Sequence, residues 1–236
     1  MPGPIRLLSE SWKFYRTHLI TLLKLIIAPL LLTLILVGIA AVIVFATGGR
    51  QLSFLIPALI AAAVFAVIIS LLGRTSLIQF IVHPESYSGL FSLYKSIWPI
   101  LGKFLLTQAL AGLFILLGLV LLIIPGLILA VRYLFVPFVV LAEGKSGKAA
   151  LTQSSQYVKG KFWGIVGRSL FIGLLSIIIS VLSTQINNTL LSSLLQLIMA
   201  LVVAPLTTIY FYHLYQASKL GANDLSARRS TPASLA

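Results

Sequence analysis

The fold is decided by the stretch LITLLKLIIAPLLLTLILVGIAAVIVFA, which occupies residues 19–46. Lys24 is its one charged residue, and a helix of this length exceeds the ~30 Å hydrocarbon core of a bilayer at 1.5 Å per residue. Polar and apolar residues do not alternate along it, as they would in a strand of a membrane-spanning barrel. The stretch therefore predicts a transmembrane α-helix.

Similar apolar stretches recur outward from this one, and the composition agrees with them. Hydrophobic residues make up 59% of the 236 residues and charged residues only 9%. Soluble domains carry about 25% charged residues, so lipid is the solvent that this chain requires. We expect an all-α integral membrane protein of about six spans. The predicted spans are residues 19–46, 52–82, 97–124, 127–142, 162–182 and 190–213.

The chain is expected to form one polytopic membrane domain over residues 1–220. The first span is too long for a removable signal peptide and lacks a convincing cleavage site, so we expect it to be retained. Residues 221–236 offer almost no apolar face to bury. A disordered polar tail is therefore predicted there.

The 17 lysines and arginines predict the orientation. If the chain starts in the cytoplasm, all of them face that side except Arg50 in an outer loop and Arg132 in the fourth span. The positive-inside rule then predicts that both termini are cytoplasmic. The same cations account for the net charge of +13, because they lie at span ends, where anionic headgroups are. We expect anionic lipids as partners at the cytoplasmic face and no nucleic acid.

Three basic segments precede spans and have amphipathic character, namely residues 5–19, 87–98 and 147–161. Each is expected to lie in the inner headgroup layer before the chain turns into the membrane. Two interpretations remain open. The segments could mark three repeats of an interfacial helix plus a transmembrane hairpin. Alternatively, any basic amphipathic helix before a span resembles another without true repetition.

The chain offers few groups for catalysis. It has no cysteine, four acidic residues and three histidines, and none of the acidic residues lies deep in a predicted span. A pump built on intramembrane carboxylates is therefore not expected. The histidines lack metal-binding spacing, and no serine-nucleophile motif is present. We expect no enzymatic activity, no catalytic residue, no metal and no cofactor.

Arg132 is the costliest residue of the predicted spans. An unpartnered guanidinium about 9 Å inside a membrane costs some kilocalories per mole. It could snorkel to headgroups, or it could form an anion or lipid-headgroup site. In the second interpretation Ser176 and Ser180 of the fifth span, followed by Ser183 and Thr184, would supply hydroxyl groups. Small hydroxyl residues at this spacing also simply let helices pack closely.

Two further residues are expected to shape the fourth span. Pro137 lacks a backbone donor, so a kink is predicted midway along the span. Glu143 lies too far along the helix axis from Arg132 to pair with it. We expect Glu143 to meet Lys145 or Lys148 at the inner surface, or to cap the following segment.

A family resemblance runs through this part of the chain. The pattern resembles a signature of uncharacterised bacterial six-span inner-membrane proteins, and is similar to the membrane domain attached to some glycerophosphoryl diester phosphodiesterases. The resemblance implies a fold and a location in the bacterial cytoplasmic membrane. In those relatives hydrolysis belongs to a separate soluble domain, so no phosphodiesterase activity is implied. The residues that carry the resemblance most clearly are Pro125, Gly126, Arg132, Pro137, Glu143 and Gly144.

Two classes of function remain open on the sequence. The first is a non-enzymatic membrane module that organises lipid or binds a partner protein, which the interfacial segments and the missing catalytic groups favour. The second is a transporter or channel for a small or anionic solute. Arg132, the serines of the fifth span and the prolines at 57, 137 and 205 favour this alternative.

Overall fold

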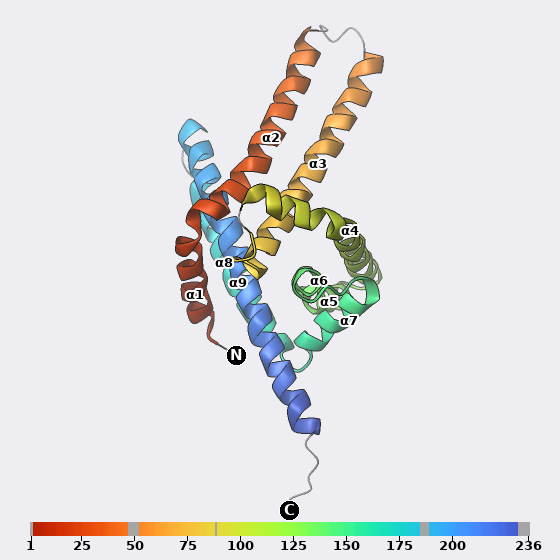
Figure 1. Cartoon of the computed structure of the whole chain (residues 1–236), viewed down its shortest axis with the longest axis vertical. Helices are drawn as coiled ribbons and strands as arrows, with labels where there is room; N and C mark the ends of the chain where they lie inside the picture. Colours follow the sequence, from red (N-terminus) through yellow and green to blue (C-terminus); the bar gives the residue numbers. More distant parts are fainter. Residues whose placement is uncertain (1, 47–51, 88, 185–188, 231–236) are drawn as a thin grey trace, which may run out of the picture. The chain divides into compact units, whose positions relative to one another are not determined.

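The computed structural model describes residues 2–46, 52–87, 89–184 and 189–230, and over these ranges the chain is helical with no strand (Figure 1). The protein is therefore an all-α membrane protein, as predicted. The described helices are α1 (Pro4–Thr17), α2 (Leu19–Ala46), α3 (Leu52–Val82), α4 (Leu90–Leu121), α5 (Ile123–Arg132), α6 (Val136–Glu143), α7 (Gly147–Val158), α8 (Phe162–Thr184) and α9 (Thr189–Ser230).

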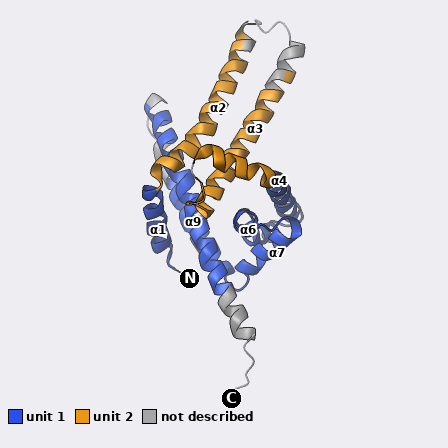
Figure 2. Ribbon diagram, viewed as in Figure 1, with its two compact units in different colours: residues 1–17, 102–236 blue, residues 18–101 orange. Residues whose placement is uncertain are grey.

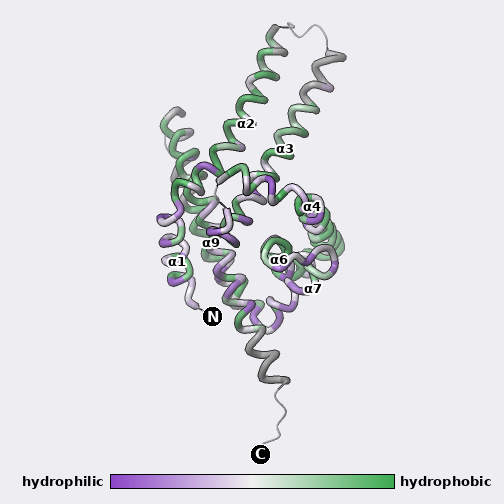
Figure 3. The backbone as a smooth tube through the Cα atoms, viewed as in Figure 1, coloured by the Kyte–Doolittle hydropathy of each residue, from purple (hydrophilic) through white to green (hydrophobic). Residues whose placement is uncertain are grey.

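Five segments of the described chain are long and apolar enough to cross a membrane, and a sixth is formed if α7 and α8 count as one bent span. Their side chains are largely unburied, as Leu34 in α2 and Val120 in α4 illustrate with 63% and 77% exposure. Figure 3 shows apolar residues along most of α2 and α3. In a soluble protein these surfaces would aggregate, so they are the surfaces that lipid covers.

The described chain divides into two compact units, coloured in Figure 2. Unit 2 comprises residues 18–101 and is dominated by the α2–α3 hairpin. The two helices of the hairpin approach closely where Gly73 faces Pro29, since a Cβ at Gly73 would lie 2.8 Å from the proline Cγ. Packing of the hairpin on itself explains why it separates as a unit.

Unit 1 comprises residues 1–17 and 102–236. Within it α8 and α1 both pack on α9. The ring of Phe14 in α1 lies 6.4 Å from that of His213 in α9, and Arg168 in α8 donates a hydrogen bond of 2.9 Å to the carbonyl of Pro2. The core is richest around α6, where Val136 and Val139 are fully buried.

The α4–α5 reversal is tighter than the sequence predicts. The predicted spans 97–124 and 127–142 leave Pro125 and Gly126 to form the reversal, but α4 ends at Leu121 and α5 already begins at Ile123. Pro125 and Gly126 therefore lie in the first turn of α5, where a missing N–H costs nothing. Gly118 of α4 and Gly126 of α5 face each other and let the two helices touch. A Cβ at Gly118 would lie only 2.9 Å from the Cα of Gly126.

The fourth predicted span is interrupted, as expected from Pro137, but the interruption lies earlier. The chain leaves helical geometry between Arg132 and Val136, and Pro137 stands in the first turn of α6. A proline ring excludes the carbonyl four residues before it, so the break falls on the N-terminal side of the proline.

The three amphipathic segments have different outcomes. The first forms α1 and the third forms α7, which is bent by 95° from α8. The second was expected to be separate from its span, but it runs into α4 as one helix despite Pro99. Separate amphipathic helices therefore precede α2 and α8, whereas the second segment is continuous with α4.

Helix α9 and the predicted disordered tail, residues 221–236, overlap in sequence. Helix α9 continues to Ser230, and residues 231–236 lie outside the described residues. Leu225, Ala227 and Arg228 are good helix formers, so a helix already nucleated in the membrane extends through them at little cost.

Candidate functional site

The first polar cluster of unit 1 surrounds Glu143, the last residue of α6. Gly144 ends this helix in the left-handed conformation with a φ of 67°, and its N–H bonds to the Val140 carbonyl at 3.1 Å. Gly147, with a φ of 57°, then starts α7. Its N–H bonds at 2.8 Å to the hydroxyl of Thr107 in α4. These two glycines let α7 return beside α6.

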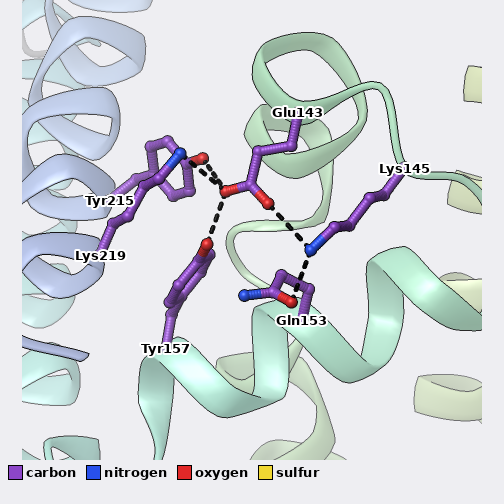
Figure 4. Close-up of polar contacts among 6 residues, drawn as sticks. All are labelled: Glu143, Lys145, Gln153, Tyr157, Tyr215 and Lys219. Carbon is purple, nitrogen blue, oxygen red and sulfur yellow. Dashed lines mark hydrogen bonds and ion pairs between the residues drawn. The ribbon is translucent and has the colours of Figure 1, made fainter. Parts of the chain in front are cut away.

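The Glu143 carboxylate joins three helices (Figure 4). Its Oε1 accepts hydrogen bonds from the hydroxyls of Tyr157 in α7 and Tyr215 in α9, at 2.6 and 2.7 Å. Lys219 lies 3.0 Å from the same oxygen, and Lys145 lies 3.4 Å from Oε2. We call Glu143, Lys145, Tyr157, Tyr215 and Lys219 the Glu143 clamp. It ties α6, α7 and α9 together.

Aromatic rings seal the clamp on one side. The Tyr215 ring stacks on Phe138 at 5.7 Å and meets the Tyr157 ring edge-on at the same distance. Tyr215 is only 2% exposed, and the Glu143 side chain 10%. A carboxylate this poorly hydrated requires charged and hydrogen-bonding partners, and the clamp supplies four of them.

The tyrosine hydroxyls of the clamp act as hydrogen-bond donors to the carboxylate. Burial raises the pKa of Tyr157 to about 12, and the hydrogen bond to Glu143 adds to the rise. The phenol is therefore a neutral donor at physiological pH. Lys145 also donates to Gln153 of α7 at 2.7 Å, which fixes its ammonium beside the carboxylate.

The second feature is an open groove of about 740 Å³ where α5, α7 and α8 meet. Its cationic residues are Arg132, the last residue of α5, and Lys159, in the turn between α7 and α8. We call it the Arg132 groove. Its lining residues are Ile128, Arg132, Tyr133, Leu151, Thr152, Ser155, Gln156, Val158, Lys159, Gly160, Phe162 and Trp163.

Local contacts shape this groove. The buried hydroxyl of Ser154 in α7 donates to the Arg132 carbonyl at 2.7 Å and so holds α7 against the end of α5. Gly160, with a φ of 77°, allows the sharp turn into α8. The turn is closed by the Lys161 N–H, which bonds to the Val158 carbonyl at 3.0 Å. The side chain of Trp163 projects outward and is 81% exposed.

The predicted site is only partly assembled. Arg132 lines the groove, but Ser176 does not, and its hydroxyl donates instead to the Ile172 carbonyl at 2.8 Å. The side chains of Ser180, Ser183 and Thr184 lie outside the described residues. The hydroxyl groups that share the groove with Arg132 come from Thr152 and Ser155 of α7.

Sequence reasoning found one partner of Glu143 and missed three. Lys145 is two residues away and was expected, whereas Lys148 is absent from the clamp. Tyr157, Tyr215 and Lys219 were not expected. The spacing of Tyr215 and Lys219 at i and i+4 places them on one face of α9. Nothing in that spacing links them to a carboxylate 72 residues earlier.

Within the described parts of the chain, no group of three histidine, aspartate or glutamate side chains is arranged to hold a metal ion. His18 lies instead against the ring of Phe80 at 5.7 Å. The imidazole rings of His18 and His213 each lie against a phenylalanine ring.

Comparisons with known proteins yield no relative, since no protein-family model, no curated protein and no solved structure matches this chain.

Proposed function

We propose that this chain is a non-enzymatic protein of the bacterial cytoplasmic membrane, with both termini inside, that organises anionic lipids at the inner face. The observation that carries the proposal is α7, a basic helix that is bent by 95° from the membrane-spanning α8 and held by the Glu143 clamp. A helix so placed lies along the headgroup layer when α8 crosses the membrane.

The two faces of α7 support this placement. Its buried face packs on unit 1 through Ala150, Leu151 and Tyr157. Its outer face exposes Lys148 and Gln156, and Lys159 follows at its end. Basic side chains at a membrane surface each contribute about 1 kcal/mol of attraction to anionic lipid.

The clamp gives this surface rigidity. Because α6, α7 and α9 share one carboxylate, α7 cannot swing about the bend without breaking hydrogen bonds to Glu143. Preorganised cations bind headgroups without first losing conformational entropy. A fixed basic surface is therefore suited to gathering lipids or docking a partner protein rather than to a moving gate.

The chemistry of the chain favours a non-enzymatic role. It lacks cysteine and has four carboxylates in all. The Glu143 carboxylate is already engaged by two tyrosines and two lysines, three of which contact its Oε1 and one its Oε2.

Lipid selectivity in proteoliposomes tests the proposal. Trace spin-labelled phosphatidylglycerol and phosphatidylcholine report, by electron paramagnetic resonance, how much of each lipid the protein immobilises. We expect phosphatidylglycerol to be preferred, and Lys148→Gln to lower the preference about two- to fivefold. Ala149→Gln, on the neighbouring exposed position, is the matched control and should leave it unchanged.

Equal immobilisation of the two lipids would overturn the proposal. The alternative is a transporter or channel, which the cationic groove at Arg132 favours. Flux of small anions from the same vesicles, abolished by Arg132→Gln, would establish it instead.

A further inference from the structure

We infer that the Arg132 groove binds the phosphate of a phospholipid headgroup, with Arg132 and Lys159 as its ligands and Trp163 at the boundary to the acyl chains. This inference rests on the proposed function and specifies it, because it names one discrete site within the basic surface of α7. The lipid-organising surface could exist without such a site, and the experiment below separates the two.

The groove has the size and the charge for a phosphate. Its volume of about 740 Å³ falls within the ordinary range of small-molecule sites. Arg132 and Lys159 approach it from different elements, and no acidic side chain lines it. Within the described chain the ion pairs of acidic residues involve Glu10 and Glu143, neither of which reaches these two cations. The groove therefore carries uncompensated positive charge.

The start of α8 adds to that charge. Phe162 and Trp163, the first two residues of this 23-residue helix, line the groove. The first N–H groups of a helix have no partner within it, and its N-terminal end carries a partial positive charge. A phosphate in the groove would thus meet a guanidinium, an ammonium and a helix N-terminus together, which is an arrangement that favours anions.

The groove has both polar and apolar lining residues, which fits an amphiphile. Thr152, Ser155 and Gln156 of α7 provide donors and acceptors for glycerol or ester oxygens. Ile128 and Phe162 provide apolar surface in the same groove, and Trp163 is exposed beside it. Exposed tryptophan is typical of the boundary between headgroups and acyl chains. Free phosphate has no apolar group that could contact these apolar side chains.

The site also accounts for Arg132 better than outward snorkelling does. Ser154 fixes the Arg132 backbone beside α7, so Arg132 shares a groove with Lys159 of the basic turn. The charge can therefore reach headgroups at the inner side, along α7, without crossing hydrocarbon. An arginine within a membrane-spanning segment costs so much free energy that a partner of opposite charge is expected.

Binding of short-chain lipids to the full-length protein in detergent tests the inference by isothermal titration calorimetry. The probes are dioctanoyl phosphatidylglycerol, dioctanoylglycerol and inorganic phosphate. We expect saturable binding of dioctanoyl phosphatidylglycerol, at least tenfold weaker binding of inorganic phosphate, and none of dioctanoylglycerol. Arg132→Gln should weaken phosphatidylglycerol binding about tenfold or more, and Lys159→Gln by about fivefold to tenfold.

Two further variants discriminate between explanations. Lys148→Gln removes an equal charge from α7, outside the groove, so it should change phosphatidylglycerol binding less than twofold. Trp163→Ala should weaken phosphatidylglycerol binding and leave phosphate binding unchanged. Both side chains are exposed, so neither change disturbs the core.

Each other outcome overturns part of the inference. Phosphate binding as tight as phosphatidylglycerol binding would make the groove a free-anion site. Equal losses from Arg132→Gln and Lys148→Gln would mean diffuse attraction, which rejects the site and keeps the proposed function. No binding by any probe, together with no phosphatidylglycerol preference in proteoliposomes, would reject both.

Discussion

At the scale of the residue, Glu143 shows how a single carboxylate organises surrounding helices. Its neighbours in space come from 14 and 72 residues further along the chain, through Tyr157 and Tyr215. Removing the negative charge would leave two lysine ammonium groups without their anion. Substitution of Glu143 is therefore expected to destabilise unit 1.

Glu143→Gln is expected to lower the free energy of unfolding by about 1–3 kcal/mol, since charge-assisted hydrogen bonds become neutral ones while the shape is kept. Thermal unfolding in detergent, followed by circular dichroism, measures the loss. Glu85→Gln is the matched control, because Glu85 is exposed, and it should change stability by less than about 0.5 kcal/mol. Equal effects of the two substitutions would show that the clamp does not stabilise the fold.

The sequence could predict only the local part of this site. Lys145 was expected beside Glu143 because it follows in the chain, whereas for Arg132 both snorkelling and an anion or lipid-headgroup site stayed open. Tyr215 and Lys219 could not be assigned, since a single sequence does not tell which face of α9 meets α6. Arg132 lines the same groove as Thr152 and Ser155, and not as Ser176, and this arrangement depends on the 95° bend between α7 and α8. Hydropathy does not encode that bend.

At the scale of the element, the helices best predicted are those defined by hydropathy alone. Helices α2 and α3 have the bounds that were expected, 19–46 and 52–82, because turn-forming or charged residues mark their ends. The break between α5 and α6 was misplaced, because the apolar pattern continues through Tyr133 to Phe135. A span was expected to start at residue 97, but α4 already begins at Leu90, and Pro99 does not interrupt it.

The α4–α5 reversal gives a prediction about packing. Gly126→Ala should destabilise the protein by about 1–3 kcal/mol, because the added Cβ would lie 2.5 Å from Leu119 Cγ and 2.6 Å from its backbone nitrogen. Gly112→Ala in the same α4 helix has no atom within 4 Å of the new Cβ, so it should be neutral or stabilise by up to about 1 kcal/mol. Unfolding by sodium dodecyl sulfate titration compares the two. A neutral Gly126→Ala would mean that the reversal is looser than described.

At the scale of the whole molecule, the number of apolar helices and the charge distribution together predict the orientation. Five or six segments of the described chain can cross a membrane, and the proposed topology leaves both ends in the cytoplasm. Arg50, the one cation expected in an outer loop, lies outside the described residues. The orientation therefore needs a direct measurement.

The absence of cysteine makes this measurement simple, since single cysteines can be introduced without a background. Ser9→Cys in α1 should react with a membrane-impermeant maleimide in inverted vesicles and not in right-side-out vesicles. Gln51→Cys, in the loop predicted to be outside, should show the opposite pattern. Labelling of Ser9→Cys from the outside would reverse the topology and move the α7 surface to the other leaflet.

The packing of α1 on α9 has a consequence for the order of synthesis. Phe14 is translated early, but its ring partner His213 emerges 199 residues later. At about 5–20 residues per second the ribosome needs on the order of ten to forty seconds to bridge that interval. During this interval the face of α1 that carries Leu7 and Tyr15 cannot yet pack on α9. Helix α1 of the nascent chain therefore has to bind the membrane surface or a chaperone. The packing of α1 in unit 1 is thus completed only after α9 has been synthesised.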